Sequence, residues 1–369
     1  MLNPKEFAKE LIKVAEFFAG VPDSVLKHLC TALEEIAPFH TSVNEGAAVA
    51  LSAGYTIATG KLGAVYMQNS GIGNSINPLL SLNDALVYSI PTLLIIGWRG
   101  EPNVKDEPQH IKQGLVTEEL LRACGIPYKI LPSNFGEAVE MLNWAKATME
   151  STSAPVALLV RNNLFEEIKV QRKNNYVYKR EQAIEDILSC LSGDELVIST
   201  TGMISRELWD VRMKQKGDCA DLLTVGSMGH VSQIAMGIAL NRPEDKVVCL
   251  DGDGSVLMHM GSMVTVGQRK VGNMIHIVLN NSAHDSVGGH KTDAANVDWK
   301  ALALACGYDC AWSVNNFDEL ENAMRDITNC TKGSCFLEIK IVQGARADVS
   351  RPAKTPVEIK QDFEKTMRR

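Results

Sequence analysis

The segment 247–281 constrains the fold of this chain more than any other stretch of the sequence. The apolar run 247–250 (VVCL) has the length and β-branching of a buried strand. Apolar residues at helical spacing follow through about Lys270, and 275–279 (IHIVL) has the pattern of a second strand. A strand, a helix and a second strand in this order form a βαβ unit, which predicts an open, parallel α/β sheet.

Polar residues follow both of these strands. The first strand leads into 251–255 (DGDGS), and the second ends in two asparagines, the latter being Asn281. Ligands of open α/β sheets bind at this carboxyl edge. Asp253 and Asn281 offer oxygen ligands, while Gly252 and Gly254 let backbone amides approach an anion at a helix start. Such donors suit a magnesium ion shared with phosphate oxygens, although an Asp/Gly turn alone is a common surface feature.

A Gly-Asp-Gly sequence followed about 25 residues later by two asparagines resembles the diphosphate and metal signature of thiamine-diphosphate enzymes. The resemblance implies that Asp253, Asn281 and the carbonyl of Ala283 bind Mg²⁺. It also implies that the cofactor's diphosphate lies against the turn at Gly252, Gly254 and Ser255. Many relatives have glycine at the third metal position, but only a carbonyl is used there, so Ala283 is compatible with the role.

Glu45 is the second candidate feature, at the point where a short strand gives way to a helix. A glutamate in the first turn of a helix is often only a cap that the helix dipole favours. In thiamine-diphosphate enzymes, however, one such glutamate hydrogen-bonds the N1′ atom of the aminopyrimidine and favours the tautomer that deprotonates the thiazolium. The segment 42–60 (SVNEGAAVALSAGYTIATG) resembles the corresponding helix, which implies that Glu45 is catalytic.

Two further segments resemble cofactor-binding parts of the same family. The carbonyl of Gly226 would accept from the cofactor's 4′-amino group, Ser227 follows it, and Met228 would support the bent cofactor. A core methionine is the plain alternative for Met228. Thr201 and Gly202 resemble part of the diphosphate loop.

Strand-like and helix-like runs alternate in both halves of the chain. This alternation predicts the fold class α/β, with two doubly wound parallel-sheet domains and no middle domain between them. The resemblance implies that both domains have the thiamine-diphosphate-binding fold. The predicted boundaries are 1–165 for a pyrimidine-binding domain, 166–182 for a polar linker and 183–369 for a diphosphate-binding domain.

Composition excludes several classes of protein. Hydrophobic residues make up 45% and charged residues 22%, as in soluble proteins with sizeable cores. A net charge of −7 argues against nucleic acid as a partner. No apolar run approaches the roughly 18 residues of a membrane span. The 9 cysteines form no CxxC pair, which favours reduced thiols and a cytoplasmic location.

Four motifs resemble the phosphonopyruvate and sulfopyruvate decarboxylase group, namely 20–24 (GVPDS), 97–102 (GWRGEP), 105–110 (KDEPQH) and 226–230 (GSMGH). The resemblance implies a lyase that decarboxylates 3-phosphonopyruvate to phosphonoacetaldehyde in phosphonate biosynthesis, with thiamine diphosphate and Mg²⁺. Sulfopyruvate decarboxylation remains an alternative. A carboligase such as acetolactate synthase is a second alternative, but such enzymes carry a middle domain. A non-catalytic phosphate-binding module is the third, and it would have no need of Glu45.

Proton transfer and substrate binding have their own candidates. Asp23 and His110 lie in loops at strand ends, and an imidazole titrates near neutral pH. A phosphonate adds negative charge, which calls for cations or hydrogen-bond donors. The substrate-binding candidates are Asn69, Ser70, Arg99, Lys105, Gln109 and His110. Further polar candidates are Asn74, Lys112, His284, His290, Lys291, Arg346 and Arg351.

The resemblance also implies an assembly. In the family, the cofactor lies between the pyrimidine-binding domain of one subunit and the diphosphate-binding domain of another. The expected partners are therefore a small anionic 2-oxo acid and further copies of the chain, as a homodimer or homotetramer with active sites between chains.

Overall fold

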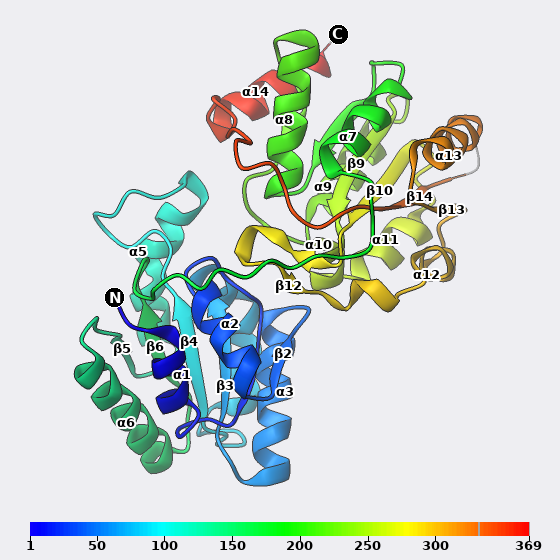
Figure 1. Ribbon diagram of the computed structural model, residues 1–369. Helices are drawn as coiled ribbons and strands as arrows, with labels where there is room; N and C mark the ends of the chain where they lie inside the picture. The colour runs from blue at the N-terminus through cyan, green and yellow to red at the C-terminus, as the bar shows by residue number, and fades with distance from the viewer. Residues whose placement is uncertain (331–332, 369) are drawn as a thin grey trace. The chain divides into compact units, whose positions relative to one another are not determined.

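The chain forms two compact units, Met1–Gln171 and Arg172–Arg369, in a computed structural model that describes residues 1–330 and 333–368 (Figure 1). The division falls inside the segment 166–182, and the sequence-based domain boundaries stay predictions.

The first unit is built on six parallel strands in the order β2-β1-β3-β4-β6-β5. The strands are β1 (Phe17–Gly20), β2 (Phe39–Thr41), β3 (Gly63–Gln68), β4 (Thr92–Gly97), β5 (Tyr128–Ile130) and β6 (Val156–Val160). The central strands β4 and β6 are buried along their whole length, because helices cover both faces of a parallel sheet. Along β3, Tyr66 faces one layer of helices and Val65 the other.

Helices α1 (Pro4–Leu11), α2 (Lys27–Ile36) and α6 (Phe135–Thr152) pack against one face of this sheet. Helices α3 (Glu45–Thr59), α4 (Ile72–Pro78) and α5 (Pro108–Ala123) pack against the other. A 3₁₀ turn, Asn69–Gly71, precedes α4, and a π-helical turn, Leu79–Asn83, follows it. The first unit is therefore a doubly wound α/β domain.

The second unit repeats this architecture with parallel strands in the order β13-β14-β10-β9-β7-β8. The strands are β7 (Leu196–Ser199), β8 (Leu222–Leu223), β9 (Val247–Gly252), β10 (Met274–Asn280), β13 (Cys310–Val314) and β14 (Cys335–Lys340). A separate antiparallel pair is formed by β11 (Ala283–His284) and β12 (His290–Lys291).

Helices cover both faces of the second sheet as well. Helices α7 (Arg180–Ser189), α8 (Met203–Lys216) and α13 (Phe317–Asn329) pack on one face. Helices α9 (Val231–Asn241), α10 (Asp253–Met258), α11 (Gly261–Arg269) and α12 (Trp299–Cys306) pack on the other. Helix α14 (Pro356–Thr366) contributes one buried residue to each core. Short 3₁₀ turns are found at Asp285–Val287 and Asp293–Asn296.

The structure confirms the predicted fold class, and no third domain lies between the two within residues 1–330 and 333–368. The helix expected to run to about Lys270 is instead two helices, because His259 leaves helical backbone geometry at φ −136° and ψ 51°. The sequence did not reveal β5 and β13, whose partly exposed residues lack a continuous apolar pattern. In the part of the chain that the structure describes, no helix has the length and apolarity to cross a membrane.

Candidate active site

Asp253 is the first residue of α10 and lies directly after β9, with only 2% of its surface exposed. The parallel register pairs Leu279 of β10 with Gly252 of β9, which brings the ends of both strands together. Thr292 Oγ1 donates to Asp253 Oδ2 at 2.5 Å, and the backbone N–H of Asn281 also donates to this carboxylate. Burial raises the pKa of Asp253 to about 7, so a nearby cation would favour its charged form.

Asn281 is buried at the end of β10. Its Nδ2 donates to Asp285 Oδ2 at 2.6 Å, and its Oδ1 accepts from the N–H of Ala283 at 3.1 Å. A carboxylate only accepts hydrogen bonds, so the amide nitrogen must be the atom that faces Asp285. Asn281 Oδ1 therefore remains available as a ligand for a cation that is also bound by Asp253.

Ser255 links the three loops expected to hold the diphosphate. Its hydroxyl lies 3.0 Å from Thr200 Oγ1 and accepts from the N–H of Gly229 at 3.1 Å. Thr200 directly precedes the half-buried Thr201 and Gly202. Gly202 has a φ of 94°, which side-chain-bearing residues rarely adopt, and α8 begins at the next residue.

Gly254 packs closely against the side chains of His284 and Met228. A Cβ atom at this position would lie 2.8 Å from His284 Cε1 and 3.5 Å from Met228 Cε. Met228 is half-buried, and its neighbour Ser227 has a φ of 54°, an uncommon backbone conformation for a residue other than glycine. Burial, and secondarily His290, lowers the pKa of His284 to about 4, so this imidazole is neutral at pH 7.

The second unit therefore fits a magnesium diphosphate group by the chemistry of its donors. A buried carboxylate, an oriented amide oxygen and a glycine cradle converge at one sheet edge. The sequence-based set Gly226, Ser227, Gly252 and Ala283 lies in the same loops, with Gly226 half-buried and Ala283 at the start of β11.

In the first unit, Glu45 begins α3 and is 5% exposed. Asn44 caps the helix by accepting from the N–H of Ala47 at 2.8 Å. Asn74 Nδ2 donates to Glu45 Oε2 at 2.7 Å, so the further polar candidate Asn74 contacts the proposed catalytic acid. Burial raises the pKa of Glu45, which favours a carboxylic acid able to donate a hydrogen bond.

Gly71 packs directly against the Glu45 side chain, and nothing in the local sequence indicates this contact. A Cβ atom on Gly71 would lie 2.4 Å from Glu45 Oε1 and 2.5 Å from its Cγ. We therefore expect Gly71→Ala to displace the Glu45 side chain and lower kcat by at least about tenfold, since a small misplacement of a catalytic group is costly. The control is Gly73→Ala, two residues on in α4, where a Cβ would meet no atom within 4 Å. Equal kcat values for Gly71→Ala and the parent protein would contradict this packing.

Asp23 lies in the loop after β1 and is fully buried. Its Oδ1 accepts from Gln68 Nε2 at 2.7 Å, and its Oδ2 accepts from the N–H of Val25 at 2.8 Å. A Cβ on Gly97 would lie 2.1 Å from Asp23 Oδ2, so this glycine permits the carboxylate to approach the end of β4. Asp23 therefore lies where β1, β3 and β4 end.

His110 lies in the first turn of α5 and is half-buried. Burial and the neighbouring Arg99 charge lower its pKa, so the free protein carries a neutral imidazole at pH 7. A Cβ on Gly100 would lie 1.9 Å from the carbonyl oxygen of His110, which shows how closely the loop after β4 approaches this helix.

Arg99 is held in place from several directions. Its Nε donates to Asp106 Oδ2 at 2.8 Å, its Nη2 bonds Asp106 Oδ1, and its Nη1 donates to Ser24 Oγ at 2.8 Å. Arg99 and two backbone N–H groups hold the pKa of Asp106 well below its usual range. Asn69 accepts from the Arg99 N–H at 3.1 Å and donates to the Arg99 carbonyl at 2.9 Å and to Thr117 Oγ1 at 2.9 Å. The Asn69 amide is thus engaged in holding the Arg99 backbone.

The other substrate candidates differ in position. Ser70 is exposed and donates to Gln68 Oε1 at 2.8 Å. Gln109 is half-buried, and within the described residues its Oε1 has no hydrogen-bond partner. Lys105 is exposed and lines a cavity of about 230 Å³ formed by residues 100–106 with Ile111 and Leu115.

Several further polar candidates are exposed. Arg346 is exposed and forms ion pairs with Glu181, Asp210 and Asp348. The positions Lys112, Lys291 and Arg351 are also exposed.

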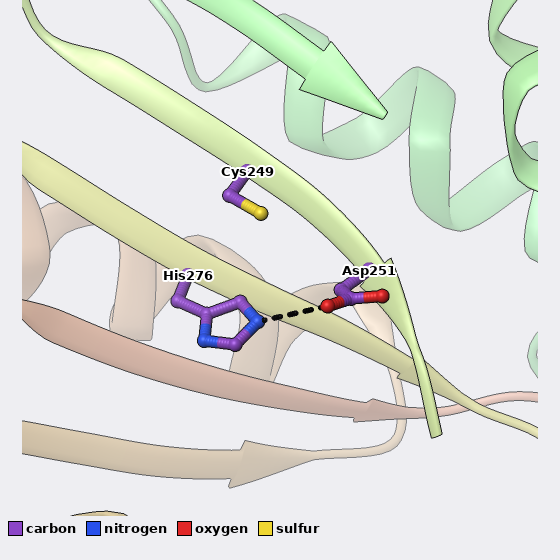
Figure 2. Close-up of side chains that lie close together, drawn as sticks. All are labelled: Cys249, Asp251 and His276. Carbon is purple, nitrogen blue, oxygen red and sulfur yellow. Dashed lines mark hydrogen bonds and ion pairs between the residues drawn. The ribbon is translucent and has the colours of Figure 1, made fainter. Parts of the chain in front are cut away.

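Three buried side chains of β9 and β10 lie close together, as Figure 2 shows for Cys249, Asp251 and His276. His276 Nε2 lies 3.4 Å from Asp251 Oδ2, and His276 Nδ1 lies 2.8 Å from the hydroxyl of Tyr308. Asp251 Oδ1 also accepts from the N–H of Gly252 at 2.8 Å. We interpret this buried chain as a support that fixes the end of β9, because both ring nitrogens and the carboxylate have partners.

Comparison with known proteins gives two matching domain families. The N-terminal TPP (thiamine pyrophosphate, or thiamine diphosphate) binding domain of thiamine pyrophosphate enzymes matches residues 8–120. The C-terminal TPP binding domain matches residues 200–339. A phosphonopyruvate decarboxylase from Streptomyces viridochromogenes is 34% identical over 94% of this chain and 89% of its own length. The chain belongs to the thiamine-diphosphate-dependent decarboxylases.

Relatives in this family occur both as one chain and as two separate subunits. A sulfopyruvate decarboxylase from Methanosarcina acetivorans is 27% identical over 100% of this chain and 98% of its own length. In Methanocaldococcus jannaschii, sulfopyruvate decarboxylase has an alpha and a beta subunit. The alpha subunit is 41% identical over 39% of this chain and 83% of its own length. The beta subunit is 35% identical over 41% of this chain and 78% of its own length. The protein is thus a carboxy-lyase that uses thiamine diphosphate, as the sequence motifs predicted.

Proposed function

We propose that this decarboxylase converts 3-phosphonopyruvate to phosphonoacetaldehyde and CO₂ with thiamine diphosphate and Mg²⁺. The observation that carries the substrate assignment is the similarity to a phosphonopyruvate decarboxylase over 94% of the chain. The first unit also contains an anchored arginine whose charge acts on His110, and an exposed lysine in the same loop as that arginine, as an anionic substrate requires.

Thiamine diphosphate, when bound, supplies the electron sink that makes loss of CO₂ from a 2-oxo acid feasible. Asp253, Asn281 and the Ala283 carbonyl would hold the Mg²⁺. The loop residues Thr201, Gly202, Gly254 and Ser255 would hold the diphosphate, and Gly226, Ser227 and Met228 would hold the rest of the cofactor in its bent shape.

Glu45 would hold a proton opposite the aminopyrimidine, because burial favours its protonated form. Asp23 and His110 would handle protons at the substrate. A neutral imidazole at pH 7 can accept a proton, which suits His110 to this role. The Arg99 guanidinium is preorganised by Asp106, so it pays little conformational entropy when it binds an anion, and Lys105 adds a second positive charge.

The experiment that tests the substrate compares 3-phosphonopyruvate, sulfopyruvate and pyruvate in parallel by CO₂ release and aldehyde formation. We expect kcat/KM to be highest for 3-phosphonopyruvate. A higher kcat/KM for sulfopyruvate would assign that substrate instead. Preference for pyruvate would contradict an anion-binding site, and a condensed acyloin product would indicate a carboligase.

We also propose that the working enzyme is a homodimer or homotetramer, with the Glu45 half-site of one chain facing the Asp253 half-site of another. The separate alpha and beta subunits of the M. jannaschii relative support association between such halves. Light scattering of the cofactor-bound protein measures the mass directly, and a single-chain mass in the active enzyme would contradict the proposal.

A further inference from the structure

The side chain of the proposed metal ligand Asn281 is hydrogen-bonded to an ion-pair network of Asp285, Arg180 and Glu207. Asp285 Oδ2 accepts three hydrogen bonds, from Asn281 Nδ2 at 2.6 Å, Arg180 Nη1 at 3.0 Å and the N–H of Gly344 at 3.0 Å. Arg180 also binds Glu207 in a bidentate manner, with both N···O distances at 3.1 Å. The side chains of Arg180 and Glu207 are only 4% and 3% exposed, so this is an internal network.

The segment that precedes α7 takes part in the same support. Asn174 Nδ2 donates to the backbone carbonyl of Asn281 at 2.9 Å and to that of Ile341 at 3.0 Å. Arg180 is the first residue of α7, so Asn174 and Arg180 contact the loop after β10 from one short stretch of chain. This stretch, which the sequence suggested to be a plain linker, is therefore packed against the end of β10.

We propose that Asp285 is a positioning residue that fixes the Asn281 amide with Oδ1 turned toward the cation, and that Arg180 and Glu207 hold Asp285 in place. The inference rests on the proposed metal role of Asn281. A rotation of the amide by half a turn would set Asn281 Oδ1 against Asp285 Oδ2, two acceptors with no proton between them. It would also present an NH₂ group to the cation. The carboxylate at position 285 thus permits only one orientation of the amide.

The buried carboxylate of Glu207 and the partly buried carboxylate of Asp285 share the single guanidinium of Arg180. Removal of one partner from such a network leaves a buried charge without compensation. The network therefore gives Asp285 a fixed position from which it can orient Asn281, in the way that outer residues orient metal ligands in other proteins.

The test measures Mg²⁺ affinity by calorimetric titration of the full-length protein with Mg²⁺ in the presence of thiamine diphosphate. Asp285→Ala removes the acceptor, and we expect the Kd for Mg²⁺ to rise by about 10–100-fold. Asp285→Asn keeps the shape but can donate as well as accept, so both orientations of Asn281 become possible and we expect a smaller rise. At saturating Mg²⁺, kcat should recover, which a general loss of folded structure would not allow.

The matched control is Asp221→Ala. Asp221 is buried and pairs with Arg212 of α8 at 2.7 Å and 3.1 Å, but it does not contact Asn281. We expect this variant to bind Mg²⁺ with the parent affinity. If Asp221→Ala weakens Mg²⁺ binding as strongly as Asp285→Ala, the effect is a general consequence of a broken ion pair and the proposal fails.

A third variant separates this inference from the proposed metal site. If Asn281→Ala weakens Mg²⁺ binding and Asp285→Asn leaves it unchanged, the metal site stands and the positioning role is wrong. If Asn281→Ala leaves Mg²⁺ binding unchanged, the metal assignment itself fails and the inference falls with it. Asp285→Asn serves in these comparisons should Asp285→Ala fail to fold, as judged by circular dichroism.

Discussion

Glu45→Gln is expected to lower kcat by about 10²–10⁴-fold, the range for loss of a general acid–base group, while thiamine diphosphate still binds. Glutamine has nearly the same size as glutamate and can still receive the hydrogen bond from Asn74. It cannot exchange a proton with the aminopyrimidine, however. Because burial already favours the protonated form of Glu45, the amide imitates its hydrogen bonding but not its proton transfer.

Two measurements separate these effects, namely calorimetric binding of thiamine diphosphate with Mg²⁺ and steady-state turnover. The control is Glu137→Gln, since Glu137 also stands in the first turn of a helix, α6, but is exposed. We expect Glu137→Gln to leave kcat unchanged, which shows that loss of a helix-dipole interaction is not the cause. Parent-like kcat in Glu45→Gln would refute the catalytic assignment, and loss of binding alone would make Glu45 a cofactor ligand only.

The site residues that the sequence predicts most directly lie within one continuous stretch each, and their roles stay predictions. Asp253 follows the first strand and Asn281 the second strand of one βαβ unit, and the parallel pairing of β9 and β10 brings the ends of these strands together. Glu45 was found in the same way, as a glutamate at the first turn of a helix rich in small residues. The local sequence pattern was sufficient for these predictions, because it determines which residues follow a strand or begin a helix.

The parts that sequence reasoning missed depend on contacts between distant segments. Arg180 and Asp285 are far apart in the chain, and nothing in either local sequence indicates their pairing. Gly71 is an ordinary loop glycine until the structure places Glu45 against it. Asp106 lies closer to its partner, and the opposite charges of Arg99 and Asp106 within one loop were a usable signal.

The sequence predicted several cationic residues as ligands of the substrate anion, and the structure shows that these cations differ in the partners they already have. Arg346 was a candidate for the substrate anion, but the structure gives its guanidinium three carboxylate partners on the surface of the second unit. Arg99 has one carboxylate partner and a hydroxyl, and the backbone around it is fixed by Asn69. The sequence identifies the cations, whereas their partners decide which of them can meet a ligand.

Asp253→Asn is expected to abolish Mg²⁺-dependent binding of thiamine diphosphate and, at the same time, to stabilise the cofactor-free protein above neutral pH. Burial raises the pKa of Asp253 to about 7 in the folded protein, against 3.8 for an ordinary aspartate. Between these values the folded state keeps a proton that the unfolded chain releases, so the free energy of unfolding falls as the pH rises from about 4 to about 7. Above pH 7 this cost has its full value, roughly 4 kcal/mol at the 1.36 kcal/mol that each pKa unit represents.

Asparagine avoids this cost because it has no charge to bury, and its carbonyl oxygen can still accept the hydrogen bond from Thr292. Urea unfolding in EDTA should therefore show little difference between the two proteins at pH 4 and a higher free energy of unfolding for Asp253→Asn at pH 8. Asp221→Asn is the contrasting control, since Asp221 is paired with Arg212 and its loss should destabilise the protein. Two outcomes would contradict this prediction. One is Mg²⁺-dependent cofactor binding by Asp253→Asn that equals that of the parent protein. The other is a free energy of unfolding at pH 8 that is lower for Asp253→Asn than for the parent protein. If Asp253 binds Mg²⁺ as proposed, the cation relieves this electrostatic cost, and the stability of the protein is then coupled to occupation of the site.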